Sequence, residues 1–332
     1  MLTKKQNLLE CIRGGNPDRI VNQWEAFSRV IANPVVDRTL DADGRMVDEW
    51  GVWFQVAGQP GRMPMHDMEH RVIKDFDEWE EQLTTIPKGC WDNAAIWEPL
   101  QAQAEAIDKN EQFVMATVFP GMFERLHDLG EITETLMALY DSPDEVHEIM
   151  KIITEVELEQ AEAICKYLKP DALLHHDDWG TAKSTFMKPE MFEEFFLDSY
   201  KQVYKYYKDH GVEVLIHHSD TYGATLVPYM IEMGVDIWQG CLLRPNELNK
   251  LVDQYGGQIS FMGGIDSDAV DKPDWTPESV KASVYDAMDY MGMADRRKFY
   301  IPCLTQGLNV STFPGVLEEV SKCISEYEAE HK

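Results

Sequence analysis

Short apolar runs rich in β-branched residues alternate along this chain with amphipathic stretches of helical length. The runs predict buried strands and the stretches predict helices. The expected strands are 19–27, 113–119, 172–178, 212–219, 236–240, 259–265 and 298–304. The expected helices are 131–168 with a break at 141–145, 189–209, 223–233, 246–255, 276–291 and 315–330. Strand alternating with helix indicates parallel strands joined by right-handed crossovers.

Polar residues gather where the expected strands end. They are Trp24-Glu25, Asp177-Asp178-Trp179, His218-Ser219-Asp220, Gln239, Asp266 and Cys303. In a closed barrel the carboxyl ends of all strands form one rim, which carries the chemistry of such enzymes. An open sheet would spread the same residues along an edge. We therefore predict an α/β fold, a (β/α)8 TIM barrel.

The segment 37–111 interrupts this rhythm. Its turn residues and alternating aromatics predict a small hairpin, followed by helices near the barrel mouth. No linker marks an independent domain, so we expect one barrel domain over 1–332 with 37–111 as an inserted cap segment.

The formal net charge of the 332 residues is −29. A surface this acidic repels nucleic acid and anionic lipid, which are therefore not expected as partners. The first residues lack the apolar region of a signal peptide, and no apolar run approaches the roughly 20 residues that span a bilayer. We expect a cytoplasmic protein. Its six cysteines are scattered without a CxxC pair, which argues against a disulfide framework.

The sequence VLIHHSDTYG at 214–223 places imidazoles and a carboxylate at one strand end. His218 and Asp220 are two residues apart on a strand, so their side chains point the same way. With Cys303 from a later strand they form a candidate three-ligand Zn²⁺ site. The alternative is that His217 and His218 are hydrogen-bonded barrel residues and that Cys303 only packs.

Four segments of the chain carry a family resemblance. In order they are HHDDWGTAKSTFMKPEMFEEFFLDSYKQVYKYYKDHGVEVLIHHSD, GVDIWQG, FMGGID and YIPCLTQG. This order resembles the uroporphyrinogen decarboxylase superfamily from about residue 110 to the C-terminus, and more loosely from residue 4. The resemblance implies a (β/α)8 barrel. It also implies one of two activities, tetrapyrrole decarboxylation or corrinoid-dependent methyl transfer.

The methyltransferases of this superfamily hold zinc on a His-x-Cys motif and a distant Cys. The matching positions here are His218, Asp220 and Cys303, with an aspartate in place of the first cysteine. An oxygen ligand makes a harder site that suits polarising an ether oxygen.

The decarboxylase branch fits the chain less well. It meets a substrate with many carboxylates through an Arg-Gln-Ala-Gly-Arg-Tyr signature. The corresponding place here reads VNQWEAFSRV. Its Trp24 is uncharged and its Glu25 is negative, so neither attracts a polyanion.

The resemblance thus favours a zinc-dependent methyltransferase that moves the methyl group of a methoxylated aromatic to cob(I)alamin on a corrinoid protein. This would be the first methyltransferase of an anaerobic O-demethylase. A methylamine or methyl thiol donor, a tetrapyrrole decarboxylase and a non-catalytic barrel that binds a corrinoid partner remain as alternatives.

Five further residues are candidates for catalysis or substrate binding. Asp178 is expected to orient substrate or a zinc-bound histidine, and Glu25 to act as a general acid or further ligand. Trp24, Phe123 and Trp179 are expected to stack on the aromatic ring. The alternative for all three aromatics is packing in the core.

Overall fold

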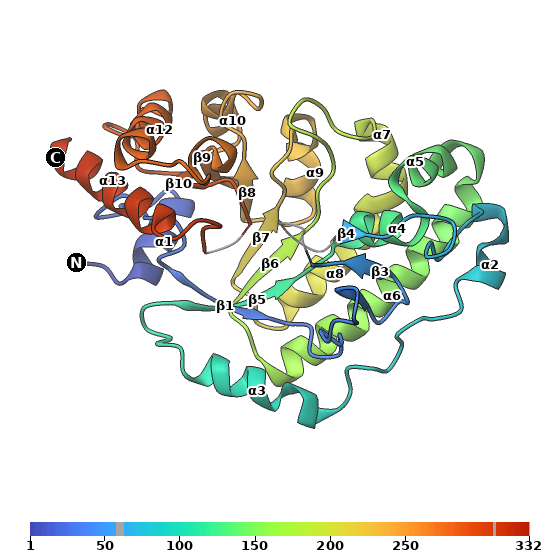
Figure 1. Cartoon of the computed structure of the whole chain (residues 1–332). Coiled ribbons are helices and arrows are strands. Elements are labelled where there is room, and N and C mark those ends of the chain that lie inside the picture. The colour runs from blue at the N-terminus through green and yellow to red at the C-terminus, as the bar shows by residue number, and fades with distance from the viewer. Residues whose placement is uncertain (58–62, 308–309, 332) are drawn as a thin grey trace.

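The computed structural model describes residues 1–57, 63–307 and 310–331. In these ranges a sheet of seven parallel strands curls into a half-barrel with helices around its outside (Figure 1). The strands, in the order in which they lie side by side, are β1 (Phe27–Ile31), β5 (Phe113–Val118), β6 (Ala172–His176), β7 (Val214–His218), β8 (Ile237–Cys241), β9 (Ser260–Ile265) and β10 (Tyr300–Leu304). The α/β barrel class predicted from the strand and helix alternation is confirmed.

Helices are present in every range predicted as helical, and further helices, such as Lys4–Ile12 and Met122–Gly130, lie outside those ranges. From the N-terminus to β6 they are α1 (Lys4–Ile12), the 3-10 turn η1 (Phe76–Glu78), α2 (Trp79–Gln82), α3 (Ala94–Glu105), α4 (Met122–Gly130), α5 (Ile132–Asp141) and α6 (Pro143–Tyr167). After β6 they are α7 (Pro189–Phe192), the π-helical turn η2 (Glu193–Leu197), α8 (Asp198–Asp209), the 3-10 turn η3 (Ala224–Leu226), α9 (Val227–Glu232), α10 (Leu248–Tyr255), α11 (Ser267–Val270), α12 (Pro277–Tyr290) and α13 (Val316–Glu330). The expected break near 141–145 is confirmed, since Pro143 occupies the first turn of α6.

The first strand lies later in the chain than the sequence indicated. The expected strand 19–27 is wrong, because β1 begins at Phe27 and residues 19–26 form turns. Gln23 has a φ of 49°, which is incompatible with an extended strand. The apolar side chains of Val21 and Trp24 pack with Phe27 and Phe113 inside the amino-terminal end of the barrel, which explains the apolar run without a strand.

Seven strands replace the eight of the predicted barrel, and the Gln23 side chain, in the turns before β1, bonds to β10 and α13. Within the described residues β1 pairs with β5 and β10 pairs with β9, with no ladder between β1 and β10. The Gln23 amide lies at this seam. Its Nε2 donates to Ser321 Oγ at 2.8 Å and to the Leu317 carbonyl at 3.1 Å, and its Oε1 accepts from Leu304 N at 3.5 Å.

The apolar core has two parts, as alternation along the strands requires. One cluster fills the barrel interior and includes Met115, Leu174 and Ile216. The other lies between the strands and the surrounding helices and includes Leu173 and Leu215. Neighbouring residues of the same strand therefore point alternately into the barrel interior and towards the surrounding helices.

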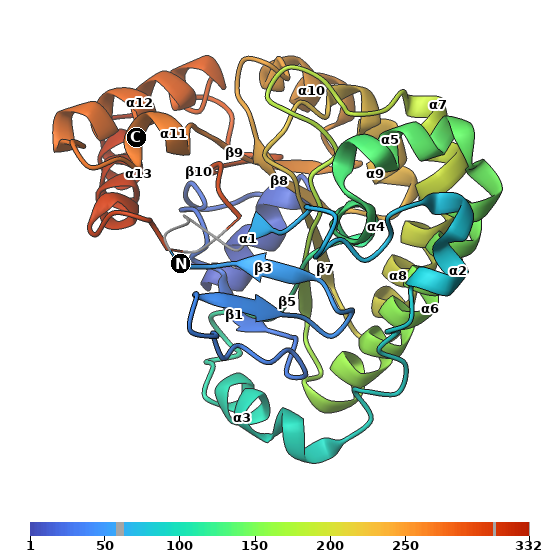
Figure 2. The ribbon, with the colours of Figure 1, turned by 45° about the vertical axis from the view of Figure 1, so that its right-hand side comes forward.

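The segment after β1 forms a small antiparallel sheet of β2 (Arg45–Val47), β3 (Trp53–Gln55) and β4 (Met63–Pro64). Residues 58–62 of the predicted hairpin lie outside the described residues. Figure 2 shows this sheet in front of the barrel strands. A buried ion pair joins the sheet to α4, with Arg125 Nη1 2.5 Å from Asp48 Oδ2, and the guanidinium lies 5.4 Å from the Trp50 ring centroid.

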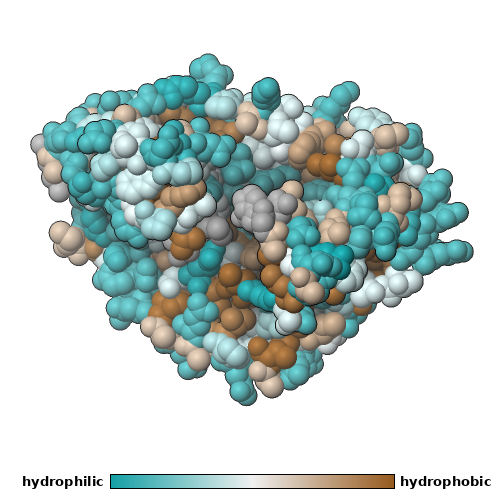
Figure 3. All heavy atoms as spheres, viewed as in Figure 1, coloured by the Kyte–Doolittle hydropathy of each residue, from teal (hydrophilic) through white to brown (hydrophobic). Residues whose placement is uncertain are grey.

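Hydrophilic residues cover most of the face seen in Figure 3, and hydrophobic residues gather on its lower part, over β1 and α3. No helix in the described part of the chain has both the length and the apolar character needed to cross a bilayer.

Candidate metal centre and active site

The carboxyl ends of β5, β6 and β7 open into a cavity of about 480 Å³. The small sheet and α4 complete its wall, so side chains far apart in the sequence meet there. Figure 1 shows β3, β4 and α4 beside the ends of these strands. The lining residues are Phe54, Pro64, Thr117, Phe119, Pro120, Glu124, His127, Asp128, Leu174, His176, His218, Asp220, Gln306 and Gly307. The lining thus combines apolar side chains with imidazoles and carboxylates.

Two histidines and an aspartate converge at the polar part. His176 ends β6 and His218 ends β7, and the parallel register pairs them. Their rings stack with centroids 4.4 Å apart. His176, Asp178 and His218 each offer a ligand atom, and these atoms lie within 4.8 Å of one another. The geometry fits a small divalent ion with two nitrogen ligands and one oxygen ligand.

Gln239 on β8 fixes which nitrogen of His218 is free. Its Nε2 donates to the carbonyls of Leu304 and Gln306 at 3.1 and 3.2 Å, so its Oε1 faces His218 and accepts from Nδ1. Burial is the main cause that lowers the pKa of His218, to about 3, and the neighbouring His176 lowers it further. His218 is therefore neutral at pH 7 and presents the lone pair of Nε2, as a metal ligand requires.

Glu124 on α4 holds His176 in the same manner. The Glu124 Oε2 atom lies 3.0 Å from His176 Nδ1. Burial opposes the charge on each partner, but their mutual attraction outweighs it. The pKa of His176 rises to about 10 and that of Glu124 falls to about 2. The remaining nitrogen, Nε2, is directed to Asp178, with Oδ2 at 4.0 Å.

Asp177 fixes the position of Glu124 through the backbone of α4. Its carboxylate accepts from the backbone N–H groups of Phe123 at 2.8 Å and Glu124 at 2.9 Å, at the first turn of α4, and from the Tyr200 hydroxyl. The two backbone hydrogen bonds cap the first turn of the helix, so Asp177 anchors the helix that carries Glu124. A Cβ at Gly121 would lie 2.4 Å from the Asp177 side chain, so only glycine fits there.

Asp178 and Asp220 form an acidic pair at the cavity. Asp178 Oδ1 accepts from the Asp220 backbone N–H at 3.1 Å. Burial raises the pKa of Asp178 to about 7, with His176 opposing the shift and Glu124 and Asp220 adding to it. A cation among these groups would relieve this like-charge repulsion.

The uroporphyrinogen decarboxylase family model matches residues 128–327. That is more than half of the chain. The chain belongs to the uroporphyrinogen decarboxylase family. The matched range contains β6 to β10 and therefore His176, Asp178, His218 and Gln239.

Among solved structures, the chain is similar to a methyltransferase from Methanosarcina mazei, with a TM-score of 0.64 at 13% identity, covering 98% of this chain and 99% of that one. A sugar phosphate isomerase/epimerase from Parabacteroides distasonis matches with a TM-score of 0.39 at 12% identity, covering 69% of this chain and 80% of that one. The first likeness shows the barrel fold over the whole length. No curated protein matches the sequence.

The predicted ligand set is not the one that the structure brings together. Among the described residues His218 is grouped with His176 and Asp178, and Cys303 is in no group that could hold an ion. Cys303 is fully buried on β10, and its thiol shares a hydrogen bond with Gln239. Burial raises the pKa of this thiol, so it stays protonated. Asp220 lines the cavity beside the group.

The predicted aromatic residues lie outside the cavity. Phe123 is buried on α4 against His127, Phe186 and Phe196. Trp179 is buried, and the centroids of its ring and of the His217 ring are 3.9 Å apart. Both pack in the layer between strands and helices, so the placement of these rings against a substrate is corrected. The cavity offers Phe54 and Phe119 instead.

Trp24 and Glu25 lie at the other end of the barrel. They precede β1, whereas the cavity lies beyond the carboxyl ends of the strands. Glu25 Oε1 accepts from the Asn22 backbone N–H at 3.1 Å, and Trp24 packs inside the barrel. Their expected role at the rim rested on a strand at 19–27, so this placement is corrected as well.

A sequence repeat provides a signal for His176 that the pattern of strand ends alone does not. The run LLHHDD at 173–178 repeats as LIHHSD at 215–220 on the next strand. Parallel strands in register place equivalent positions side by side, so the two copies bring His176 and Asp178 beside His218. Glu124 and Gln239 carry no such signal, because their roles depend on how α4 and β8 pack.

Proposed function

We propose that this family member is a zinc-dependent methyltransferase that moves the methyl group of a methoxylated aromatic to cob(I)alamin on a corrinoid protein. In the reaction the bond from oxygen to methyl breaks and a bond from cobalt to carbon forms, and the phenolate departs and takes up a proton. This is the chemistry of the first methyltransferase of an O-demethylase. The similar Methanosarcina mazei protein, described as a methyltransferase, favours this branch of the family.

One observation carries the proposal: the cavity combines a nitrogen and oxygen donor group with an apolar wall and offers no lysine or arginine among its described lining residues. A tetrapyrrole with many carboxylates needs cations for binding. The described wall instead presents Glu124, Asp128 and Asp220. The cavity therefore suits an uncharged or weakly charged aromatic ether better than a polyanion.

The residues that would hold zinc are His176 and His218, each through Nε2, and Asp178. They fit this group because each imidazole already has its Nδ1 occupied, by Glu124 and by Gln239. Bound zinc would supply Lewis acidity that polarises the ether oxygen. Asp220 remains a candidate for a further oxygen ligand, since it lines the same cavity.

The chain's own residues bind and orient the substrate. Phe54, Phe119 and Leu174 form the apolar part of the wall, where an aromatic ring can pack. Glu124 and Gln239 keep the two imidazoles in fixed orientations, so the ether oxygen meets a preorganised polar end. The cavity volume of about 480 Å³ lies in the range usual for small-molecule sites.

The test uses purified protein, free cob(I)alamin and a panel of methyl donors. A methoxybenzene derivative should give the spectral change to methylcobalamin, whereas methylamine and methanethiol should not. Zinc should copurify, and His176→Ala and His218→Ala should lose both zinc and methyl transfer while remaining folded. His210→Ala is the control, since this exposed imidazole bonds only the Tyr206 carbonyl 2.8 Å away.

Each alternative gives a different result. If only methylamine or methanethiol is turned over, the proposed methyl donor is wrong, but the protein is still a methyltransferase. Decarboxylation of a porphyrinogen by the metal-free protein would overturn the proposal. Absence of turnover with every donor, by protein that retains zinc and binds a corrinoid protein, would indicate a non-catalytic partner-binding barrel.

A further inference from the structure

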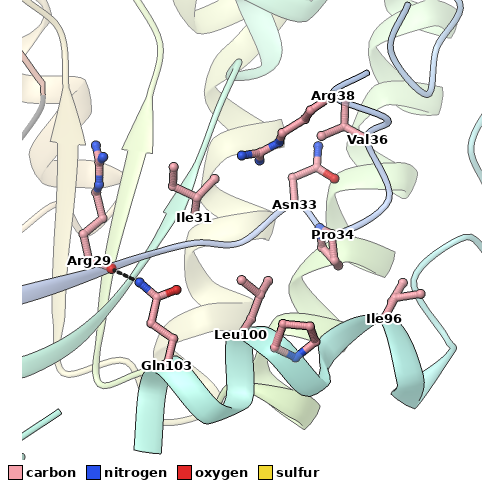
Figure 4. Close-up of a pocket in the computed structure, with 10 residues that line it drawn as sticks. Arg29, Ile31, Asn33, Pro34, Val36, Arg38, Ile96, Leu100 and Gln103 are labelled. Carbon is pink, nitrogen blue, oxygen red and sulfur yellow. Dashed lines mark hydrogen bonds between the residues drawn. The ribbon is translucent and has the colours of Figure 1, made fainter. Parts of the chain in front are cut away.

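A second cavity of about 560 Å³ lies along the edge of β1 that has no neighbouring strand within the described residues. One wall is β1 with the segment that follows it, and the other is α3 (Figure 4). The lining residues are Arg29, Ile31, Asn33, Pro34, Val36, Arg38, Ile96, Pro99, Leu100 and Gln103. None of them lines the metal-site cavity.

This cavity is cationic in a protein with 59 acidic and 30 basic residues. Arg29 and Arg38 are the charged side chains in its described lining, which holds no carboxylate. Every other arginine of the described residues lies in an ion pair, whereas these two form none there. Two unpaired guanidinium groups at one cavity create a local positive potential.

The Arg29 guanidinium is partly buried without compensation. Its Nη1 is buried and has no hydrogen-bond partner. A buried unpaired donor costs free energy, and a negative charge bound in the adjoining cavity would reduce the cost of holding this cation there. Burial also lowers the pKa of Arg29, the direction expected for a cation that lacks a counter-ion. In Figure 4 Arg29 rises from β1, and Arg38 extends over Asn33 towards Ile31.

Asn33 adds a second unsatisfied group. Its Nδ2 donates to Glu49 Oε1 at 3.1 Å, which fixes the orientation of the amide. Its Oδ1 is buried without a partner. Asn33 therefore contributes a polar side chain of fixed orientation to the lining.

The rest of the wall is apolar. Ile31, Pro34 and Val36 come from the β1 side. Ile96, Pro99 and Leu100 come from α3, and Figure 4 shows Ile96 and Leu100 on the helix across from these residues. An inorganic anion would leave this surface exposed, whereas the apolar body of an organic anion would cover it.

We propose that this cavity binds a small organic anion, a carboxylate or phosphate ester with an aromatic or aliphatic body, through Arg29 and Arg38. The site shares no lining residue with the metal-site cavity among the described residues. Binding at this site can therefore be tested independently of the proposed methyl transfer.

Calorimetric titration of the full chain tests the proposal. The probes are 4-hydroxybenzoate, phenyl phosphate and inorganic phosphate, with 4-hydroxybenzamide as the uncharged match for the first. We expect saturable binding of the two aromatic anions, and binding of the amide at least about tenfold weaker. Inorganic phosphate should bind more weakly than phenyl phosphate. Equal affinities for the carboxylate and the amide would overturn the assignment.

Variants locate the site. Arg29→Gln should weaken binding of 4-hydroxybenzoate by about tenfold or more, and Arg38→Gln by less, because Arg38 is exposed. Ile96→Glu should weaken binding, because it adds a negative charge to the lining of the cavity. Arg13→Gln, which changes the net charge equally at an exposed ion pair, should leave affinity unchanged. Unaltered affinity in folded Arg29→Gln, or no saturation at about 10 mM of any anion, would refute the site.

Discussion

His176 and His218 stand side by side on neighbouring strands, with ring centroids 4.4 Å apart and each Nδ1 engaged by a different residue. The arrangement leaves Nε2 of both rings directed away from these partners. Burial, and next the neighbouring His176, lower the pKa of His218 to about 3, whereas burial of His176 is outweighed by the Glu124 carboxylate, which raises its pKa to about 10. A metal ion would replace the proton that His176 otherwise holds.

The Gln239 amide should control metal affinity without being a ligand. Gln239→Leu removes the acceptor for His218 Nδ1–H, so we expect zinc affinity to fall by about 10- to 100-fold. Competition with a chromophoric chelator measures it. Gln239→Glu keeps an acceptor at this place and should retain most of the affinity. If the leucine variant binds zinc as tightly as the parent, His218 is not held as a ligand.

The buried ion pair between Asp48 and Arg125 should be important for stability. Asp48→Asn leaves Arg125 buried without its closest counter-ion, and we expect the free energy of unfolding to fall by about 3 kcal/mol in urea titration. Asp41→Asn is a matched control. Asp41 and Asp48 each accept from the backbone N–H groups two and four residues on, but Asp41 pairs with the more exposed Arg45. The control should lose less than about 1 kcal/mol.

His127 should make stability depend on pH. Burial lowers its pKa from an ordinary 6.5 to about 4, against an opposing effect of Glu124. The unfolded chain binds this proton below pH 6.5 and the folded chain only near pH 4, so stability is lost as pH falls through this window. Between pH 7.5 and 5 we expect His127→Gln to recover roughly 2 kcal/mol relative to the parent. Equal pH slopes of the two proteins in denaturant titrations would contradict this.

The seam between β1 and β10 should depend on Gln23. Gln23→Gly removes the amide that bonds Leu304, Leu317 and Ser321, and glycine tolerates the φ of 49° at this position. We expect a loss of about 2 kcal/mol in the free energy of unfolding and faster amide exchange at Leu304. Gln101→Ala, which removes one bond to the Tyr167 carbonyl, should cost less than about 1 kcal/mol. Unchanged exchange at Leu304 would show that the seam holds without the amide.

The sequence by itself determined the layered α/β fold, because its apolar runs and amphipathic stretches match the periods of strands and helices. It also determined that His218 lies at the carboxyl end of a strand, because the buried apolar run before it ends there. Local alternation could not locate the start of β1. The turns around Trp24 pack their apolar side chains into the barrel interior. Their composition therefore resembles that of a buried strand.

Tertiary structure alone decided which chemical groups meet. Gln239 reaches His218, Glu124 reaches His176 and Cys303 stays buried beside Gln239, because these contacts depend on the curl of the sheet and the docking of α4. The cavity of Arg29 and Arg38 likewise arises where β1 has no strand neighbour and α3 packs beside it. Contacts between distant segments are fixed by packing in three dimensions, which a one-dimensional pattern of polar and apolar residues does not encode.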